Sequence, residues 1–330
     1  MIAVESRAEN RALELLKGIW RNYSVLVVFV GIIGICAIAA PRFLRMDNLL
    51  NILRNTSTVG AIALGMTFVI IAGGIDLSSG PVLATAGAVL ILLQRMVNAD
   101  GTPAVPLALA IVACLAVATS FGFLNGIIIT KAKLPPFIVT LAVGIMARSL
   151  VMYFMRGATV MGNNIPQFTR IGNGSVFSIP IPFLLVVGVA IIFHILLTRT
   201  KFGTYVFAVG GNENAARYSG IKVDRIRIAT YMIVGLCTGM AATIEMSRMA
   251  AVAAATSGSQ YEFEAITAVI VGGTSLTGGK GRLIGSIVGF IILGIVNNMM
   301  IMLNISPYLS GAVKGAVILF AVLMQRRERL

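Results

Sequence analysis

The residues of this chain that could do chemistry are few and scattered. It has one histidine, His194, and its three cysteines, Cys36, Cys114 and Cys237, lie far apart within apolar stretches. Nothing among its Cys, His, Asp and Glu residues has the spacing of a metal site, and no nucleophile is paired with a base. We therefore expect no catalytic residues, no bound metal and no cofactor.

The glycine-rich stretch 272–281 has the composition of a phosphate-binding loop but not its pattern. Such a loop needs glycine where Thr274 stands and a magnesium-binding hydroxyl where Gly281 stands. The chain is therefore not expected to hydrolyse ATP by itself.

Polar side chains inside apolar stretches are stronger candidates for function. Burying such groups in a membrane is costly, so each one raises the question of a solute path. Asp76 can instead cap a helix, and asparagines can hydrogen-bond between helices. Arg148, Glu245, Arg248 and Lys314 can line water, pair with one another or snorkel. The candidates for the path are Asp76, Ser78, Asn125, Asn297 and Asn298.

Two double glycines, Gly73-Gly74 and Gly272-Gly273, lie in similar surroundings. Aligning Val69–Gly80 with Ala268–Gly279 places them opposite one another, each after an apolar helix. The glycines can end the first helix, and the carboxyl or hydroxyl side chains that follow can cap the next one. Paired breaks of this kind mark interrupted helices near the substrate path of transporters. Two ordinary tight turns are an equally good interpretation.

The segment 198–227 is the most distinctive polar stretch, and it carries six basic residues. Asn212 is a good helix N-cap, Glu213 suits a first turn, and Gly220 is a natural stop. We predict a short helix whose small alanines let it seat closely in a partner's groove, in preference to a mere connector. The residues assigned to docking are Gly211, Asn212, Glu213, Ala215, Ala216 and Gly220.

The elements that must position these residues are membrane helices. Of the 330 residues, 58% are hydrophobic and only 12% are charged, about half the charged fraction of a soluble domain. Charge-free stretches close to the ~20 residues of a membrane helix recur along the chain. We predict an all-α, polytopic membrane bundle of about ten transmembrane helices, at roughly 24–40, 57–74, 80–94, 106–130, 136–155, 180–197, 228–246, 264–279, 284–303 and 309–324.

The net charge of +14 indicates orientation in the lipid bilayer and not a nucleic-acid partner. With ten crossings and a cytoplasmic N-terminus, 17 of the 26 Lys and Arg residues lie inside and seven outside. Both termini are therefore expected in the cytoplasm. Residues 1–23 then form a cytoplasmic segment, 24–330 a single transmembrane domain, and 198–227 a cytoplasmic loop within it.

Motifs at four places along the chain occur in the order and spacing of a known family. They are Gly65–Ile70 with Gly73–Ser78, Leu124–Gly126 with Pro136–Leu141, Thr200–Gly203 with Gly210–Glu213, and Val271–Leu276 with Gly278-Gly279. They resemble the ribose-type sugar permeases of bacterial ABC importers, over nearly the whole chain from about residue 40. One departure is Ser79-Gly80-Pro81, where that family commonly has Val-Gly followed by a residue other than proline.

The resemblance implies a permease of the bacterial inner membrane that usually works as a pair. Its partners would be a second permease copy, a cytoplasmic ABC ATPase subunit and a periplasmic sugar-binding protein. It also implies that Gly211–Gly220 seats on the ATPase and that the cargo is a monosaccharide, with ribose and similar pentoses first. Allose, xylose, inositol-like polyols and signalling sugars stay open, since selectivity in such systems lies mainly in the binding protein.

A stand-alone secondary sugar transporter is the alternative function. Coupling to protons or sodium would need carboxylates well inside the bilayer. Only Asp76 and Glu245 come near such a position.

Overall fold

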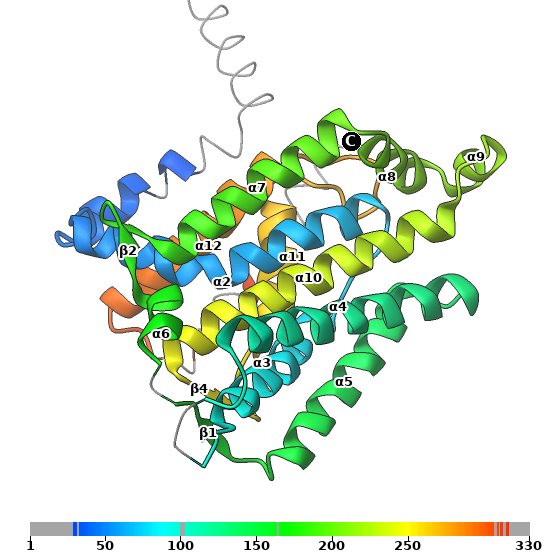
Figure 1. The fold of residues 1–330 in the computed structure, drawn as a ribbon. Coiled ribbons are helices and arrows are strands. Elements are labelled where there is room, and N and C mark those ends of the chain that lie inside the picture. Colours follow the sequence, from blue (N-terminus) through cyan, green and yellow to red (C-terminus); the bar gives the residue numbers. More distant parts are fainter. Residues whose placement is uncertain are drawn as a thin grey trace, which may run out of the picture.

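A computed structural model describes residues 29–316 apart from residues 32, 100–102, 164, 307–308, 310 and 313–314. The predicted segment 1–23, both chain ends and most of the helix predicted at 309–324 lie outside these residues. An apolar helix over Phe29–Ala39 comes first. The helices that follow (Figure 1) are α2 (Met46–Ile71), α3 (Ser79–Arg95), α4 (Leu107–Lys131), α5 (Pro136–Phe154), α6 (Pro166–Asn173), α7 (Ile181–Arg199), α8 (Lys201–Gly211), α9 (Glu213–Tyr218), α10 (Val223–Met249), α11 (Tyr261–Val271) and α12 (Leu283–Met302).

Helices α2, α4, α7 and α10 run along the length of the molecule and lie side by side (Figure 1). Helices α8 and α9 lie at one end, together with the α4–α5 connection. Helix α6 and the short strands lie at the other end. We call these the α9 end and the opposite end.

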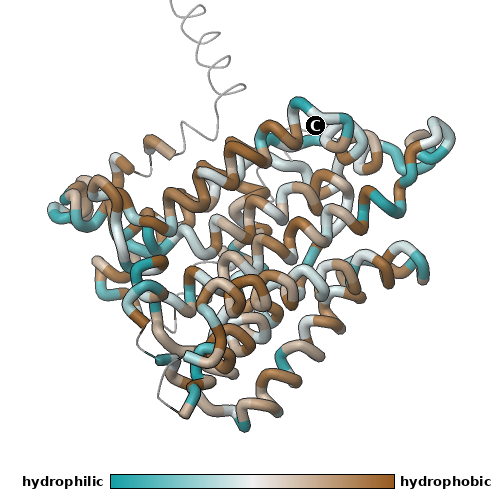
Figure 2. Tube along the Cα trace, in the orientation of Figure 1, coloured by the Kyte–Doolittle hydropathy of each residue, from teal (hydrophilic) through white to brown (hydrophobic). Residues whose placement is uncertain are grey.

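The described part of the chain has six helices that are long and apolar enough to cross a membrane, namely α2, α4, α5, α7, α10 and α12. Hydrophilic residues gather mainly towards the two ends of the bundle, and hydrophobic residues dominate between them (Figure 2). This distribution is that of a polytopic membrane protein, as the composition predicts.

Three predicted spans have the wrong limits. The stretch predicted at 228–246 is α10, which begins five residues earlier at Val223 and continues through Asp224, Arg225 and Arg227. The stretch predicted at 264–279 is α11, which ends at Val271 after 11 residues. A helix of that length is about 16 Å long and cannot cross a bilayer. The stretch predicted at 57–74 begins at Met46, because α2 continues through Asp47 and Arg54, which a search for charge-free stretches excludes.

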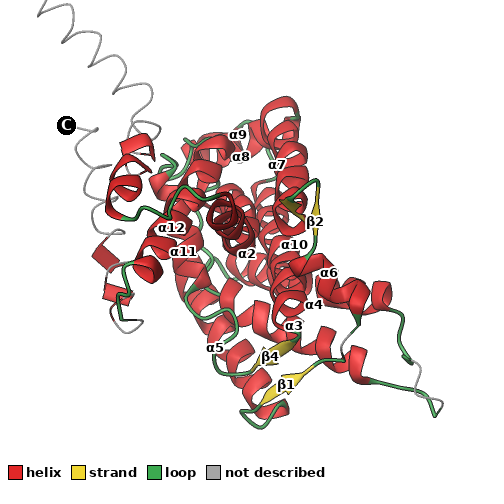
Figure 3. Ribbon diagram, turned by 90° about the vertical axis from the view of Figure 1, so that its left-hand side faces the viewer, coloured by secondary structure: helices red, strands yellow, loops and turns green. Residues whose placement is uncertain are grey.

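Two pairs of short strands are an exception to the predicted all-α class (Figure 3). Strand β1 (Thr159–Met161) pairs antiparallel with β4 (Ala251–Ala253), and β2 (Ser175–Val176) pairs with β3 (Ile179–Pro180). Strands of two or three residues are too short to show an alternating pattern in a sequence. They join connections between helices and leave the helical bundle unchanged.

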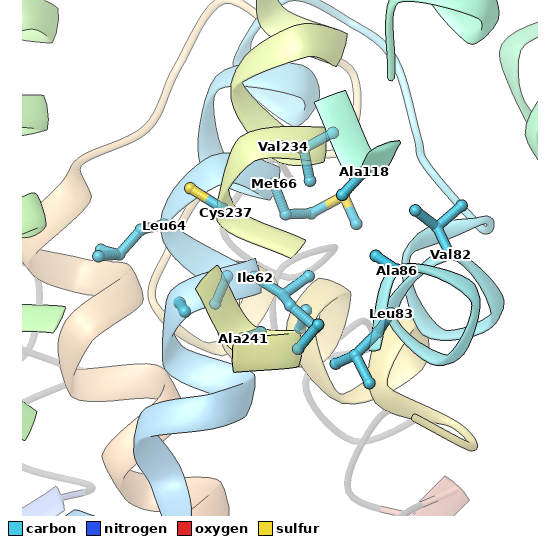
Figure 4. Close-up of a cluster of buried hydrophobic side chains, with 14 of the residues drawn as sticks. Ile62, Leu64, Met66, Val82, Leu83, Ala86, Ala118, Val234, Cys237 and Ala241 are labelled. Carbon is cyan, nitrogen blue, oxygen red and sulfur yellow. The ribbon is translucent and has the colours of Figure 1, made fainter. Parts of the chain in front are cut away.

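The centre of the bundle is α2, which packs against α7, α10, α11 and α12. Residues Thr56–Ile71 are buried without interruption, as expected for a helix that is surrounded on all sides. Figure 4 shows part of the resulting core, in which Ile62 and Met66 of α2 lie among side chains of α3, α4 and α10, while Leu64 points to the other side of α2.

Helices α4 and α10 pack closely because each presents glycines to the other. Gly122 and Gly126 on α4, and Gly235 and Gly239 on α10, all face the partner helix. A Cβ on Gly126 would lie only 2.7 Å from the Cα of Ile228. Glycines four residues apart are a common device for close helix packing in membranes.

Candidate docking surface and solute path

Helix α9 is the short helix that the sequence predicts, and it projects at one end of the molecule (Figure 1). The Oδ1 atom of Asn212 accepts a hydrogen bond from the N–H of Ala215 at 3.0 Å, as an N-cap does. Gly220 lies just beyond the helix end with φ of +81°. Gly211, Asn212, Ala215 and Gly220 are exposed. The predicted helix and both its boundaries are therefore confirmed.

Ala216 has a different environment from Ala215. Only 4% of its surface is exposed, and it packs with Val209 of α8 and Val223 of α10. Its small side chain therefore seats α9 on the rest of this chain, and Ala215 is the alanine that a partner can reach.

An ion-pair network also holds α9 in place. Glu213 contacts Arg227 of α10 at 2.7 Å and Arg217 of its own helix at 3.1 Å. Arg217 also contacts Asp224 at 3.4 Å, and Asp224 lies 3.9 Å from Lys131 at the end of α4. The hydrogen bond that Arg217 donates to Glu213 is the main reason that the pKa of Arg217 is raised. The network joins α9 to the ends of α4 and α10.

Most of the predicted loop 198–227 is helical. Helix α7 continues to Arg199, α8 follows almost at once, and α10 begins at Val223. The hydroxyl of Thr200 accepts a hydrogen bond from the N–H of Gly203 at 3.3 Å and caps α8. Sequence reasoning missed α8 because its three glycines lower helix propensity. The threonine cap and two buried valines three residues apart are the signals that would have found it.

The two double-glycine segments end their helices in the same way. Gly73 and Gly273 have φ values of +79° and +86°, which glycine adopts without strain. Successive N–H groups donate back to the last turn at 2.8 to 3.1 Å: Gly73 to Ile70 and Gly74 to Val69 after α2, and Gly273 to Ile270 and Thr274 to Val269 after α11. Both ends are Schellman motifs.

The equivalent residues are Gly73 and Gly273, one position away from the predicted alignment of Gly73 with Gly272. The likeness is confined to the helix ends. Helix α3 begins at Ser79, shortly after the first break, whereas α12 begins only at Leu283, after a longer loop.

Both breaks and α8 meet at a glycine junction, formed by Gly73, Gly210, Gly278 and Gly279. The N–H of Gly279 donates to the carbonyl of Ile71, the last residue of α2, at 2.8 Å. A Cβ on Gly210 would overlap that same carbonyl, and one on Gly278 would lie 3.0 Å from the Cα of Gly73. Because only Asn212 separates α8 from α9, α9 is connected almost directly to the end of α2 and to the loop between α11 and α12.

Asp76, Ser78 and Asn125 come together in a closed polar cluster. Asp76 Oδ1 accepts hydrogen bonds from the N–H of Ser78 at 2.7 Å and from its hydroxyl at 2.6 Å. The Nδ2 group of Asn125 donates to Ser78 Oγ at 2.8 Å. Each residue is at most 2% exposed. Asp76 thus stabilises the turn before α3, and this geometry favours its structural interpretation.

Sequence reasoning missed two residues that hold this turn. The hydroxyl of Tyr231 on α10 donates to the carbonyl of Ile75 at 3.2 Å. The hydroxyl of Thr140 on α5 accepts from the N–H of Leu77 at 3.1 Å. The signal for both was a hydroxyl group within an apolar helix.

Asn297 and Asn298 lie elsewhere, about 21 Å along α12 from its start near the glycine junction. Asn298 pairs reciprocally with Asn48 of α2, donating at 2.8 Å and accepting at 3.1 Å. Both asparagines line a cavity between α2, α10, α11 and α12. The five predicted path residues therefore form two separate groups.

The charged residues within the bundle also have structural partners. Arg148 of α5 donates to the carbonyls of Ala254 and Ser257 at 2.7 and 2.8 Å. Glu245 of α10 accepts hydrogen bonds from the N–H of Gly258 and the hydroxyl of Tyr261. These hydrogen bonds satisfy polar groups of the non-helical segment between β4 and α11, as irregular backbone requires inside a membrane protein.

Comparison with known proteins identifies relatives along nearly the whole chain. A family profile described as the permease component of branched-chain amino acid transport systems matches residues 48–322. The chain is 41% identical to the ribose import permease of Bacillus subtilis, over 92% of this chain and 90% of that one. It is 38% identical to the ribose import permease of Escherichia coli, over 92% and 93% of the two chains. It is 35% identical to the L-arabinose transport system permease of Escherichia coli, over 94% and 92%. No solved structure matches the chain.

Proposed function

Because this chain belongs to the ribose-type permease family of ABC sugar importers, we propose that it forms the membrane path for ribose or a closely similar monosaccharide. It is a multi-pass protein of the inner membrane and the permease subunit of such an importer. The identity to two ribose import permeases, over nine tenths of the chain, is the observation that carries the choice of sugar.

Helix α9 would be the contact with the ATPase subunit that supplies the energy. It is short, projects at one end, is capped by Asn212 and is held by its own ion pairs. Closure of the ATPase on ATP would push α9 and, through α8, the glycine junction. The sugar would arrive at the opposite end from a periplasmic sugar-binding protein, and a second copy of this chain would complete the path.

The distribution of charge supports a cytoplasmic α9 end. Lys and Arg are enriched on the cytoplasmic side of membrane proteins. Helices α2, α4 and α7 end at the α9 end, and α3, α5, α10 and α12 begin at that end. If the apolar stretches before α2 and after α12 each cross the membrane once, a cytoplasmic α9 end places both chain termini in the cytoplasm as well. The basic residues of the described chain at this end are Lys131, Lys133, Arg199, Lys201, Arg217, Lys222, Arg225, Arg227, Lys280 and Arg282.

The docking role of α9 is tested by substitutions on its exposed side, which leave the fold intact. Ala215→Arg adds a bulky charge to the exposed side of α9 and removes no contact within the chain, whereas Ala215→Ser is the matched small control. In proteoliposomes with the ATPase and the binding protein, we expect Ala215→Arg to abolish ATP-dependent uptake and co-purification of the ATPase. Ala215→Ser should keep both.

Glu213→Arg and Ala216→Trp test the seat of α9. They remove the ion pair with Arg227 or overfill the packing against Val209, so they should also abolish uptake while leaving membrane insertion unchanged. Normal uptake in all three variants would show that α9 is only a connector. Proton-driven sugar accumulation in liposomes that contain this chain alone would support the secondary transporter instead.

A further inference from the structure

A cavity of about 500 Å³ lies between α2, α10, α11 and α12. It is lined by residues from the first half of α2, the last turn of α10, the start of α11 and the second half of α12, all towards the end remote from α9. Ligand pockets in proteins have volumes of roughly 300–1,000 Å³, so the cavity has the size of a small-molecule site.

The lining of this cavity combines polar groups with apolar walls. Amide side chains come from Asn55 on α2 and from Asn297 on α12. The ring of Phe290 and the aliphatic side chains of Ile52 and Leu293 supply apolar surface. Amides both donate and accept hydrogen bonds, as the hydroxyl groups of a sugar do, and ring faces pack against the C–H groups of a sugar.

The charges that line the cavity balance one another. Arg248 contributes one positive charge and Glu264 one negative charge, while Tyr261 adds a neutral hydroxyl and ring. A cavity without excess charge suits a neutral solute better than a phosphate or a carboxylate, each of which would leave one of these side chains opposed by a like charge.

The two adjacent asparagines of α12 differ in a way that assigns Asn297 to the cavity. The Asn298 amide is occupied by the reciprocal pair with Asn48, and that pair joins α12 to α2. Asn297 and Asn298 are both half-buried and both line the cavity, so the pairing of Asn298 with Asn48 is what distinguishes them. The hydrogen bonds that join α12 to α2 are therefore made by Asn298 and not by Asn297.

We propose that this cavity is a monosaccharide-binding station on the solute path, in which the Asn297 amide hydrogen-bonds the hydroxyl groups of the free sugar. The inference rests on the proposed function and adds to it a position and a set of residues. A sugar that leaves the binding protein enters this cavity before it passes towards the α9 end.

Cysteine protection tests the site directly. Cys36, Cys114 and Cys237 are all buried, so the background labelling of the described chain is low. Asn297→Cys in the complete transport complex should react with a small methanethiosulfonate reagent. At a D-ribose concentration of about twice the Kd, the labelling rate should fall about threefold, because only the unoccupied fraction reacts.

Two controls belong to this experiment. Phe177→Cys, in the exposed hairpin of β2 and β3, should be labelled at the same rate with and without D-ribose. Sucrose, which is about twice the size of ribose, should leave the labelling of Asn297→Cys unchanged. Equal labelling of Asn297→Cys with and without D-ribose, in a complex that transports ribose, overturns the proposal.

Transport gives an independent readout. Asn297→Leu removes the amide and should lower uptake at limiting D-ribose about fivefold, the effect of one lost hydrogen bond, while ATPase coupling at saturating sugar is retained. Ser120→Leu, which also removes a polar group from an exposed position on a membrane helix, should leave uptake unchanged. Unaltered uptake by Asn297→Leu overturns this site alone, whereas absent uptake by the unchanged complex overturns the proposed function.

Discussion

Asp76 is, with Glu245, one of the two carboxylates that proton coupling in a secondary transporter could use. Its Oδ1 atom accepts two hydrogen bonds from Ser78 and so fixes the turn between α2 and α3. An asparagine oxygen can accept the same two bonds, but an asparagine cannot take up and release a proton as a carboxylate does.

We therefore predict that Asp76→Asn keeps most of the ATP-dependent uptake. Asp76→Ala should lose it, because the buried N–H and hydroxyl of Ser78 are left without an acceptor at a cost of about 1–3 kcal/mol. Uptake by reconstituted complexes and thermal unfolding of the purified chain measure the two effects. Loss of uptake in a stably folded Asp76→Asn would point to proton coupling at this residue.

At the scale of single residues, the sequence indicates which side chains matter better than it indicates their role. Asp76, Ser78 and Asn125 stand out as polar groups in apolar surroundings, and they do contact one another. Asn298 stands out by the same criterion and proves to bind Asn48, which is 250 residues away. Hydrogen-bond partners at that separation depend on helix packing, which no local pattern specifies.

At the scale of elements, the close contact of α4 with α10 makes a specific prediction. Gly126→Ala places a methyl group against the backbone of Ile228 and should lower the free energy of unfolding by about 1–3 kcal/mol, as overpacking does. Gly188→Ala on α7 is the matched control, since no atom lies within 4 Å of its added Cβ.

Thermal unfolding of both variants in detergent compares them directly. The unfolding temperature should fall for Gly126→Ala and stay the same or rise for Gly188→Ala, because alanine favours a helix more than glycine does. An equal change in the two variants would show that close approach at Gly126 contributes little.

The sequence predicts the end of a helix where the end of an apolar stretch determines it. It does not predict a helix end that is determined by backbone conformation. The predictions for α3, α4, α5, α7 and α12 agree with the structure to within about two residues, because long apolar stretches have clear ends. The prediction for α11 continued through Gly272 and Gly273, because the residues beyond them are also uncharged. The left-handed conformation of Gly273 ends that helix.

At the scale of the whole molecule, the arrangement predicts which parts face which side of the membrane. Phe177 lies in the hairpin of β2 and β3 with 95% of its surface exposed, and Tyr218 lies on α9 with 92% exposed. We expect Phe177→Cys to react with a membrane-impermeant thiol reagent in intact cells whose outer membrane is permeable to it. Tyr218→Cys should react only after the inner membrane is opened.

Labelling of Tyr218→Cys in intact cells would reverse the proposed orientation.

The bundle, the membrane location and the family could all be predicted from this sequence, since the composition and the order of the motifs indicate them. The contact between the two glycine breaks could not be predicted, because it joins residues more than 200 positions apart through a single backbone hydrogen bond.

The way in which α9 is held has a consequence for how a partner recognises it. A six-residue helix is unstable alone in water, yet here it is ordered by the Asn212 cap, the seat of Ala216 and the pair of Glu213 with Arg227. In the proposed docking, the ATPase subunit would therefore meet a preorganised surface, and binding would cost little conformational entropy in α9. A free peptide with the sequence of residues 208–221 would have to become ordered first, so it should compete poorly with the intact permease for the ATPase.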